Sequence, residues 1–247
     1  MTHTPLADRP LGATLGLHFA PGILLTAAYV AAVPAMRSLG LPPVFGLLLA
    51  TLFVMIPFEL GYLVVQGRRR SGRFSLDGVV TLRESVPPRQ YLFWTLLFFA
   101  WGLASSTLAS PLESALRHGL FAWLPSWYAP TSAAEFEPYS KAAMTATFGL
   151  GLVVVGLAGP IVEELYFRGH LLPRLGRFGR WAPTLNAVLF SLYHLWTPWQ
   201  NPSRVLLMVP LVQLVWTKRN LSLGIWAHCT LNAVVWAITF GALAAMR

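Results

Sequence analysis

The chain has 247 residues, of which 55% are hydrophobic and 11% are charged, and its net charge is +9. This composition is too apolar for an ordinary soluble domain and is typical of a membrane protein. The single cysteine, Cys229, excludes an intrachain disulfide and any zinc cluster built on cysteines.

Seven apolar segments reach or approach the roughly 20 residues that a helix needs to cross a bilayer. They are residues 15–36, 42–66, 91–109, 142–166, 182–197, 204–217 and 221–244. The fifth and sixth are short, which allows one of them to be tilted or partly re-entrant. Continuous apolar runs favour helices over the alternating strands of a membrane barrel. We therefore predict an all-α polytopic membrane protein whose seven to eight transmembrane helices enclose an intramembrane cavity.

Basic residues concentrate in alternate connections between these segments. They are Arg68, Arg69, Arg70, Arg73, Arg83 and Arg89 after the second segment, Arg174, Arg177 and Arg180 after the fourth, and Lys218 and Arg219 after the sixth. The connection 110–141 instead carries Glu113, Glu135 and Glu137. This alternation follows the positive-inside rule with a cytoplasmic N-terminus. Membrane topology thus explains the positive charge better than a nucleic-acid partner does.

Composition also bears on the organisation and source of the chain. Arginine supplies 16 of the 18 basic residues, which favours a bacterial protein and hence the inner membrane. We expect one membrane domain, with helices and loops without motifs in 1–141 and a motif-bearing core in 142–247. In 110–141, the stretch SALRHGLFAWLPSWY is either an amphipathic helix at the membrane interface or an ordinary loop.

Two adjacent acids, Glu163 and Glu164, interrupt the apolar run GLGLVVVGLAGPIVEELYFRG. An acidic side chain at membrane depth is costly, and it marks a functional site by default. Glu164 and Arg168 have the i,i+4 spacing and order that favour an ion pair on a helix. Glu163 lies about 100° around the helix and is the freer carboxylate. Pro160 is expected to kink the helix just before the acids.

Two later segments place a histidine one helical turn from another distinctive residue. Phe190 precedes His194, and His228 precedes Asn232. Each alone is explained as well by packing or by a hydrogen bond between helices. Counted along ideal helices from the nearest cytoplasmic basic residue, however, Glu163, His194 and His228 lie at similar depths of roughly 14 to 21 Å. We therefore expect one site, nearer the cytoplasmic side.

Glu59, in the second segment, is at a similar depth, roughly 14 Å from Arg68. It is expected to face the same cavity, where a structural role such as pairing with Arg168 is favoured over direct catalysis. An ionised carboxylate removed from bulk water is a stronger base, and a neighbouring histidine can orient a water molecule. A second histidine and an asparagine amide can donate hydrogen bonds to an oxyanion. These are the parts of a peptide-bond hydrolase without a serine or cysteine nucleophile.

In these residues the chain resembles the CPBP family of intramembrane proteases, which includes type II CAAX proteases and bacteriocin-processing enzymes. The family's motifs are EExxxR, FxxxH and HxxxN, in that order on successive membrane segments. Here they are formed by Glu163, Glu164 and Arg168, by Phe190 and His194, and by His228 and Asn232. The resemblance covers about residues 142–244.

The resemblance implies an intramembrane endopeptidase in which Glu163 is the general base and His194 its partner. Glu164 and Arg168 would brace the site, and His228 with Asn232 would form an oxyanion hole. Its substrate would be a peptide or protein, lipidated or membrane-bound in some members.

Two histidines and a glutamate could hold zinc. No helix carries HExxH, and we expect no metal or other cofactor. Two other functions stay open. One is a non-catalytic scaffold or immunity-type protein, and the other is a proton-coupled transporter, although no repeat typical of transporters is visible.

Overall fold

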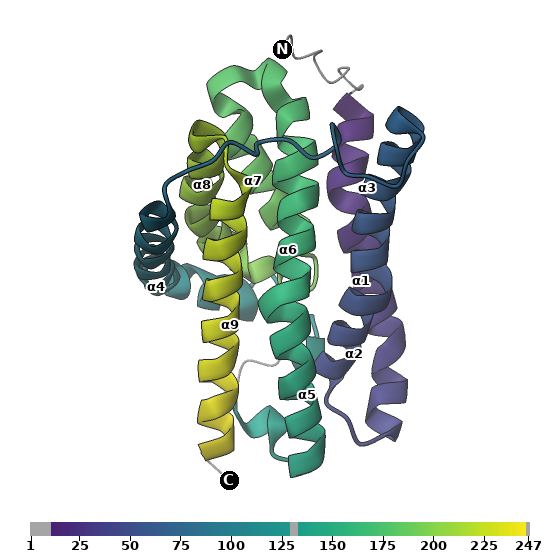
Figure 1. Ribbon diagram of the computed structural model, residues 1–247. Helices are drawn as coiled ribbons and strands as arrows, with labels where there is room; N and C mark the ends of the chain where they lie inside the picture. The colour runs from purple at the N-terminus through teal and green to yellow at the C-terminus, as the bar shows by residue number, and fades with distance from the viewer. Residues whose placement is uncertain (1–10, 129–132, 246–247) are drawn as a thin grey trace.

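The computed structural model describes residues 11–128 and 133–245, and in this part the chain is helical with no strand (Figure 1). The α-helices are α1 (Leu11–Ser38), α2 (Pro43–Ala50), α3 (Ile56–Ser71), α4 (Pro88–His118), α5 (Lys141–Val153), α6 (Gly159–Glu163), α7 (Ala182–Leu192), α8 (Asn201–Lys218) and α9 (Leu221–Ala245). Each predicted apolar segment coincides with helix over all or most of its length, which confirms the all-α class. Residues 1–10, including the N-terminus that was assigned to the cytoplasm, and residues 246–247 lie outside the described part.

The expected number of seven to eight transmembrane helices is not confirmed. Among the described residues, five helices are long and apolar enough to cross a membrane: Leu11–Ser38, Pro43–Ser71, Pro88–His118, Lys141–Leu192 and Leu221–Thr239. The fourth bends sharply at Gly179, where φ is 53°, and the chain then returns as α7. With 11 residues, α7 is roughly 16 Å long, too short to cross a bilayer. The fifth predicted span thus ends early, and residues 193–200 turn the chain into α8.

Three π-helical turns widen the helices around the centre of the bundle. They are η1 (Thr51–Met55), η4 (Val154–Ala158) and η5 (Glu164–Leu171). A proline stands at the second position of the element that follows each turn, namely Pro57, Pro160 and Pro173. Proline lacks the N–H and its ring clashes with the carbonyl four residues back, so a wider turn relieves the conflict. The kink predicted at Pro160 takes this form, and it puts Glu163 and Glu164 at the junction of α6 and η5.

The connection 72–87 crosses one end of the bundle (Figure 1). Thr81 N donates to Gly169 O at 2.9 Å, and Leu221 N donates to Leu82 O at 2.7 Å, so this connection ties η5 to the start of α9. Within this connection, the side chains of Val80 and Leu82 are buried. The three predicted basic segments meet at this end, which is the arrangement expected from the alternation of charge.

The connection after α4 is neither an interfacial helix throughout nor a simple loop. Residues 114–118 complete α4, and η2 (Ser126–Tyr128) then turns inward. Tyr128 donates through its hydroxyl to Leu195 O at 3.0 Å, and the Arg117 guanidinium lies 4.7 Å from the ring centre of Trp199. The connection therefore supports the turn between α7 and α8. Residues 129–132 of this predicted segment lie outside the described part.

Candidate functional site

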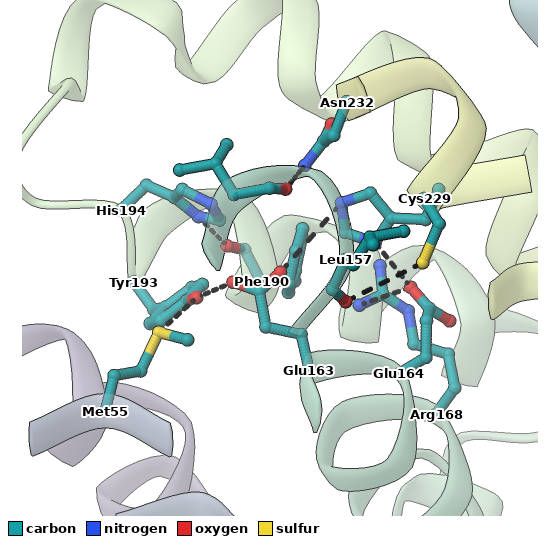
Figure 2. Close-up of polar contacts among 12 residues, drawn as sticks. Met55, Leu157, Glu163, Glu164, Arg168, Phe190, Tyr193, His194, Cys229 and Asn232 are labelled. Atoms are coloured by element: carbon teal, nitrogen blue, oxygen red, sulfur yellow. Dashed lines mark hydrogen bonds and ion pairs between the residues drawn. The ribbon is translucent and has the colours of Figure 1, made fainter. Parts of the chain in front are cut away.

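Glu163 and Glu164 are both buried, with 6% and 0% of their surface exposed, but they have different partners (Figure 2). Glu164 Oε1 lies 3.4 Å from an Arg168 guanidinium nitrogen and accepts a hydrogen bond from His228 Nδ1 at 3.0 Å. Glu163 Oε1 accepts a hydrogen bond from the hydroxyl of Tyr193. The ion pair expected from the i,i+4 spacing is present, and the two acids are separated as that spacing predicted.

His228, on α9, connects the two acids. Because a carboxylate can only accept, the proton of its imidazole belongs on Nδ1, next to Glu164. In the neutral ring, Nε2 then carries a lone pair, and this atom lies 3.9 Å from Glu163 Oε2. That separation is too long for a direct hydrogen bond and short enough for a small molecule to contact both atoms. A reacting group can therefore lie between His228 Nε2 and Glu163 Oε2.

Phe190 links the segments that carry the three motifs. The guanidinium of the fully buried Arg168 lies 3.9 Å from the ring centre of Phe190, a cation–π distance. The same ring lies 4.9 Å from that of His194 and 6.0 Å from that of His228. The aromatic residue of the second motif thus fixes the cation of the first motif and contacts both histidines.

His194 and Asn232 lie at the edge of this cluster. His194 follows the end of α7, where its Nδ1 donates to Phe190 O at 2.8 Å, and its ring packs 4.3 Å from that of Tyr193. Within the described chain, no hydrogen bond joins it to Glu163. Asn232 donates through Nδ2 to Val155 O in η4 at 3.2 Å. One amide N–H is therefore engaged with backbone, and the other is left for a ligand.

The structure also shows residues that the sequence reasoning missed. Tyr193 is fully buried and its hydroxyl contacts both Glu163 and Met55 Sδ, the latter at 3.6 Å. A tyrosine hydroxyl in an apolar helix needs a polar partner, a signal that could have identified it. Gly224 is the second residue of the site that the sequence did not indicate. Its backbone packs against Glu164, because a Cβ at this position would lie 2.7 Å from Glu164 Oε2.

Glu59 is fully buried and lies close enough to Glu163 and Arg168 to interact with their charges, as its predicted depth indicated. Neither of its carboxylate oxygens has a hydrogen-bond partner among the described residues. The direct ion pair with Arg168 that was expected does not form in this part of the chain, where Arg168 pairs with Glu164. Glu59 is therefore part of the buried cluster without a direct partner.

Two further observations concern ligands. A cavity of about 360 Å³ lies where the connection 72–87 meets η5 and the start of α9, with Leu165, Leu221 and Ile225 among its apolar lining residues and Glu84 and Asn220 among its polar ones. No three His, Cys, Asp or Glu side chains within residues 11–128 and 133–245 are arranged to hold a metal ion. His228 Nδ1 donates to Glu164 and so has no lone pair free for a metal.

An all-helical chain with membrane-length helices, folded around a buried cluster of acids, arginine and histidine, defines an integral membrane protein with an internal polar site. Residues 144–234 match the family model for type II CAAX prenyl endopeptidase, Rce1-like. This match confirms the resemblance drawn from the three motifs, and it includes all of their residues. It covers less than half of the chain. Searches of curated proteins and of solved structures found no match.

Proposed function

We propose that the protein is an intramembrane endopeptidase in which Glu163 activates the attacking water. The observation that carries the proposal is the unequal pairing of the adjacent acids. Glu164 is bound by Arg168 and by His228. Glu163 keeps one oxygen, Oε2, facing His228 Nε2 across a gap of 3.9 Å. A family of proteases and an acid with one available oxygen in a buried site both support hydrolysis.

In the proposed hydrolysis, a single side chain, Glu163, carries the proton from water to the leaving amine. Glu163 takes a proton from water, whose oxygen forms a bond to the carbonyl carbon of the scissile peptide. The resulting tetrahedral intermediate carries its negative charge on the former carbonyl oxygen. Protonated Glu163 then gives its proton to the amide nitrogen as the C–N bond breaks. The products are a carboxylic acid and an amine, and Glu163 is again a carboxylate.

The remaining residues orient this chemistry. The free N–H of Asn232 is one donor for the oxyanion. His228 can donate from Nε2 only when both of its nitrogens are protonated, because Nδ1–H is already used by Glu164. His194 borders the same space through its contact with Tyr193, from which it assists the water. Glu164 and Arg168 act by holding His228 in place.

The cavity beside Leu165 suits a peptide or protein substrate that reaches the site from the basic end of the bundle. We assign that end to the cytoplasm and the protein to a bacterial inner membrane, from the distribution and kind of its basic residues. Membrane lipid surrounds it, and substrates that are lipidated or held in the membrane fit this location. We propose that the mechanism needs no metal.

The decisive experiment compares membrane peptides from cells that carry the wild-type protein or Glu163→Gln, which keeps the size of the side chain. Glu137→Gln, an exposed acid in the connection before α5, is the matched control. We expect a cleavage product with wild type and with Glu137→Gln that is absent with Glu163→Gln. The same product in all three strains would overturn the mechanism. A phenotype that is lost without any product would favour a scaffold, and proton-coupled flux in proteoliposomes would favour a transporter.

A further inference from the structure

Polar side chains extend from the buried site toward the basic end of the bundle on two facing helices. On α3 they are Glu59, Tyr62 and Gln66, three and four residues apart, which places them on one face. The second helix carries a stripe of its own, which begins at Glu163 and continues with Tyr166, His170 and Arg174. Both helices run toward the end that the connection 72–87 crosses (Figure 1).

The two stripes contact one another. The ring of Tyr62 lies 5.8 Å from that of Tyr166 and 5.4 Å from that of His170. His170 donates through Nδ1 to Val79 O in the connection at 3.1 Å, and Arg174 donates to His170 O. The polar face of α3 is therefore turned toward the polar face of η5, with the connection 72–87 at its outer end.

The inner end of this polar face is Glu59. A fully buried carboxylate without a hydrogen-bond partner is costly, and such groups are normally satisfied by ordered water. Arg168, with which Glu59 interacts electrostatically, has no hydrogen-bond partner for its guanidinium nitrogens within the described chain. The acceptors on Glu59 and the donors on Arg168 thus both lack hydrogen-bond partners and lie in the same region. Water that bridges the two side chains would satisfy both.

We propose that the polar face between α3 and η5 is a water path that leads from the basic end of the bundle to Glu59 and Glu163. The path passes Gln66 and Tyr62, and none of the path residues named above lines the cavity beside Leu165, although η5 and the connection 72–87 border both. The substrate and the attacking water would then both come from the basic end but reach the site by different routes. This use of the path rests on the proposed hydrolase function, whereas the path itself is a property of the folded protein.

Single-cysteine labelling tests the path without any substrate, and the chain has only Cys229 to remove. In a Cys229→Ala background, Gln66→Cys and Tyr62→Cys are exposed to a membrane-impermeant, positively charged methanethiosulfonate added to inside-out vesicles. Val65→Cys is the matched control, because Val65 neighbours Gln66 but is 45% exposed on the surface of the bundle, where we expect lipid to cover it. The reagent reacts with thiolates, which require water, so we expect the two path cysteines to react at least about tenfold faster than the control.

A second arm locates the route. Glu59→Cys should react with the same reagent, and adding Tyr62→Trp should slow that reaction by about tenfold or more because the larger ring blocks the path to the thiolate. Adding Ile225→Trp, which fills the other cavity, should leave the rate unchanged. Equal labelling of Gln66→Cys and Val65→Cys, or slowing by Ile225→Trp alone, would overturn the path. A cleavage product that persists in the Cys229→Ala protein would then show that the proposed function stands without it.

Discussion

His228 Nδ1 donates a hydrogen bond to Glu164 Oε1 at 3.0 Å, and this contact fixes which imidazole nitrogen faces Glu163. The third motif therefore depends on the second acid of the first motif for its tautomer. Because Arg168 pairs with the same carboxylate oxygen, one buried atom positions two side chains, His228 and Arg168. Because of this dependence, we expect Glu164 to be essential even though it is not the proposed base.

Replacing Glu164 by glutamine tests this dependence. The amide can donate as well as accept, so His228 is no longer held in one tautomer and Arg168 loses its counter-charge. We expect turnover to fall roughly 10²- to 10⁴-fold, the scale seen when a carboxylate that orients a catalytic histidine is lost. The rate at which the cleavage product forms is the measurement. Wild-type turnover in Glu164→Gln would contradict the role given to His228.

Arg168→Met should destabilise the fold. The change leaves Glu164 as a buried charge with only His228 to pair with it, a type of change that costs about 3 to 5 kcal/mol. Thermal unfolding in detergent measures the effect. In the double variant Glu164→Gln with Arg168→Met, position 164 no longer carries a buried charge, so the loss of stability should be smaller than the sum of the single losses. Additive losses would show that the two side chains do not act as a pair.

Tyr193→Phe removes one hydroxyl and keeps the ring. Glu163 then loses the donor that holds its carboxylate. A hydrogen bond to a charged group contributes about 1.5 to 3 kcal/mol, so we expect kcat to fall by roughly 10- to 100-fold with little change in KM. Tyr29→Phe is the control, since that buried hydroxyl bonds Trp127 O and Tyr128 O instead. If Tyr29→Phe lowers kcat as much as Tyr193→Phe does, the loss of activity reflects a general loss of structure.

Gly224→Ala introduces a single methyl group next to the site. Its carbon would lie 2.7 Å from Glu164 Oε2 and 2.8 Å from a methyl of Val215, so the carboxylate must move. Overpacking of this kind costs about 1 to 3 kcal/mol, and we expect turnover to fall with stability. At Gly149, also in a helix, an added Cβ meets nothing within 4 Å, so Gly149→Ala should stabilise by about 0.5 to 1 kcal/mol. Unchanged activity in Gly224→Ala would place Glu164 outside the mechanism.

Features that depend on local sequence were predictable. Long apolar runs specify helices because, in hydrocarbon, the backbone N–H and C=O groups must form hydrogen bonds with one another. The spacing of Glu164 and Arg168 specifies their ion pair, which the structure contains. The number of spans was not predictable in the same way, because it depends on the bend at Gly179 and on where α7 ends.

Contacts between helices were less accessible to sequence reasoning. The hydrogen bond from Tyr193 to Glu163 and the bridging position of His228 depend on how each helix is rotated about its axis, which spacing within one helix does not determine. Depth along a helix, unlike rotation about its axis, can be counted from the sequence alone. It placed Glu59 at the level of Glu163, and in the structure both acids are buried and close enough for their charges to interact.

Removal of metal ions provides the last test. Zinc binds neutral imidazole nitrogens and carboxylate oxygens that converge on one point. Here His228 Nδ1 points its proton at Glu164 and Glu163 Oε1 accepts from Tyr193, which leaves His228 Nε2 and Glu163 Oε2, and among the described residues no group of three His, Cys, Asp or Glu side chains is arranged to hold a metal ion. We therefore expect EDTA and 1,10-phenanthroline to leave product formation unchanged, while a zinc-dependent peptidase in the same detergent loses its activity. Loss of turnover that returns when zinc is added would instead indicate zinc bound through His228 Nε2 and Glu163 Oε2.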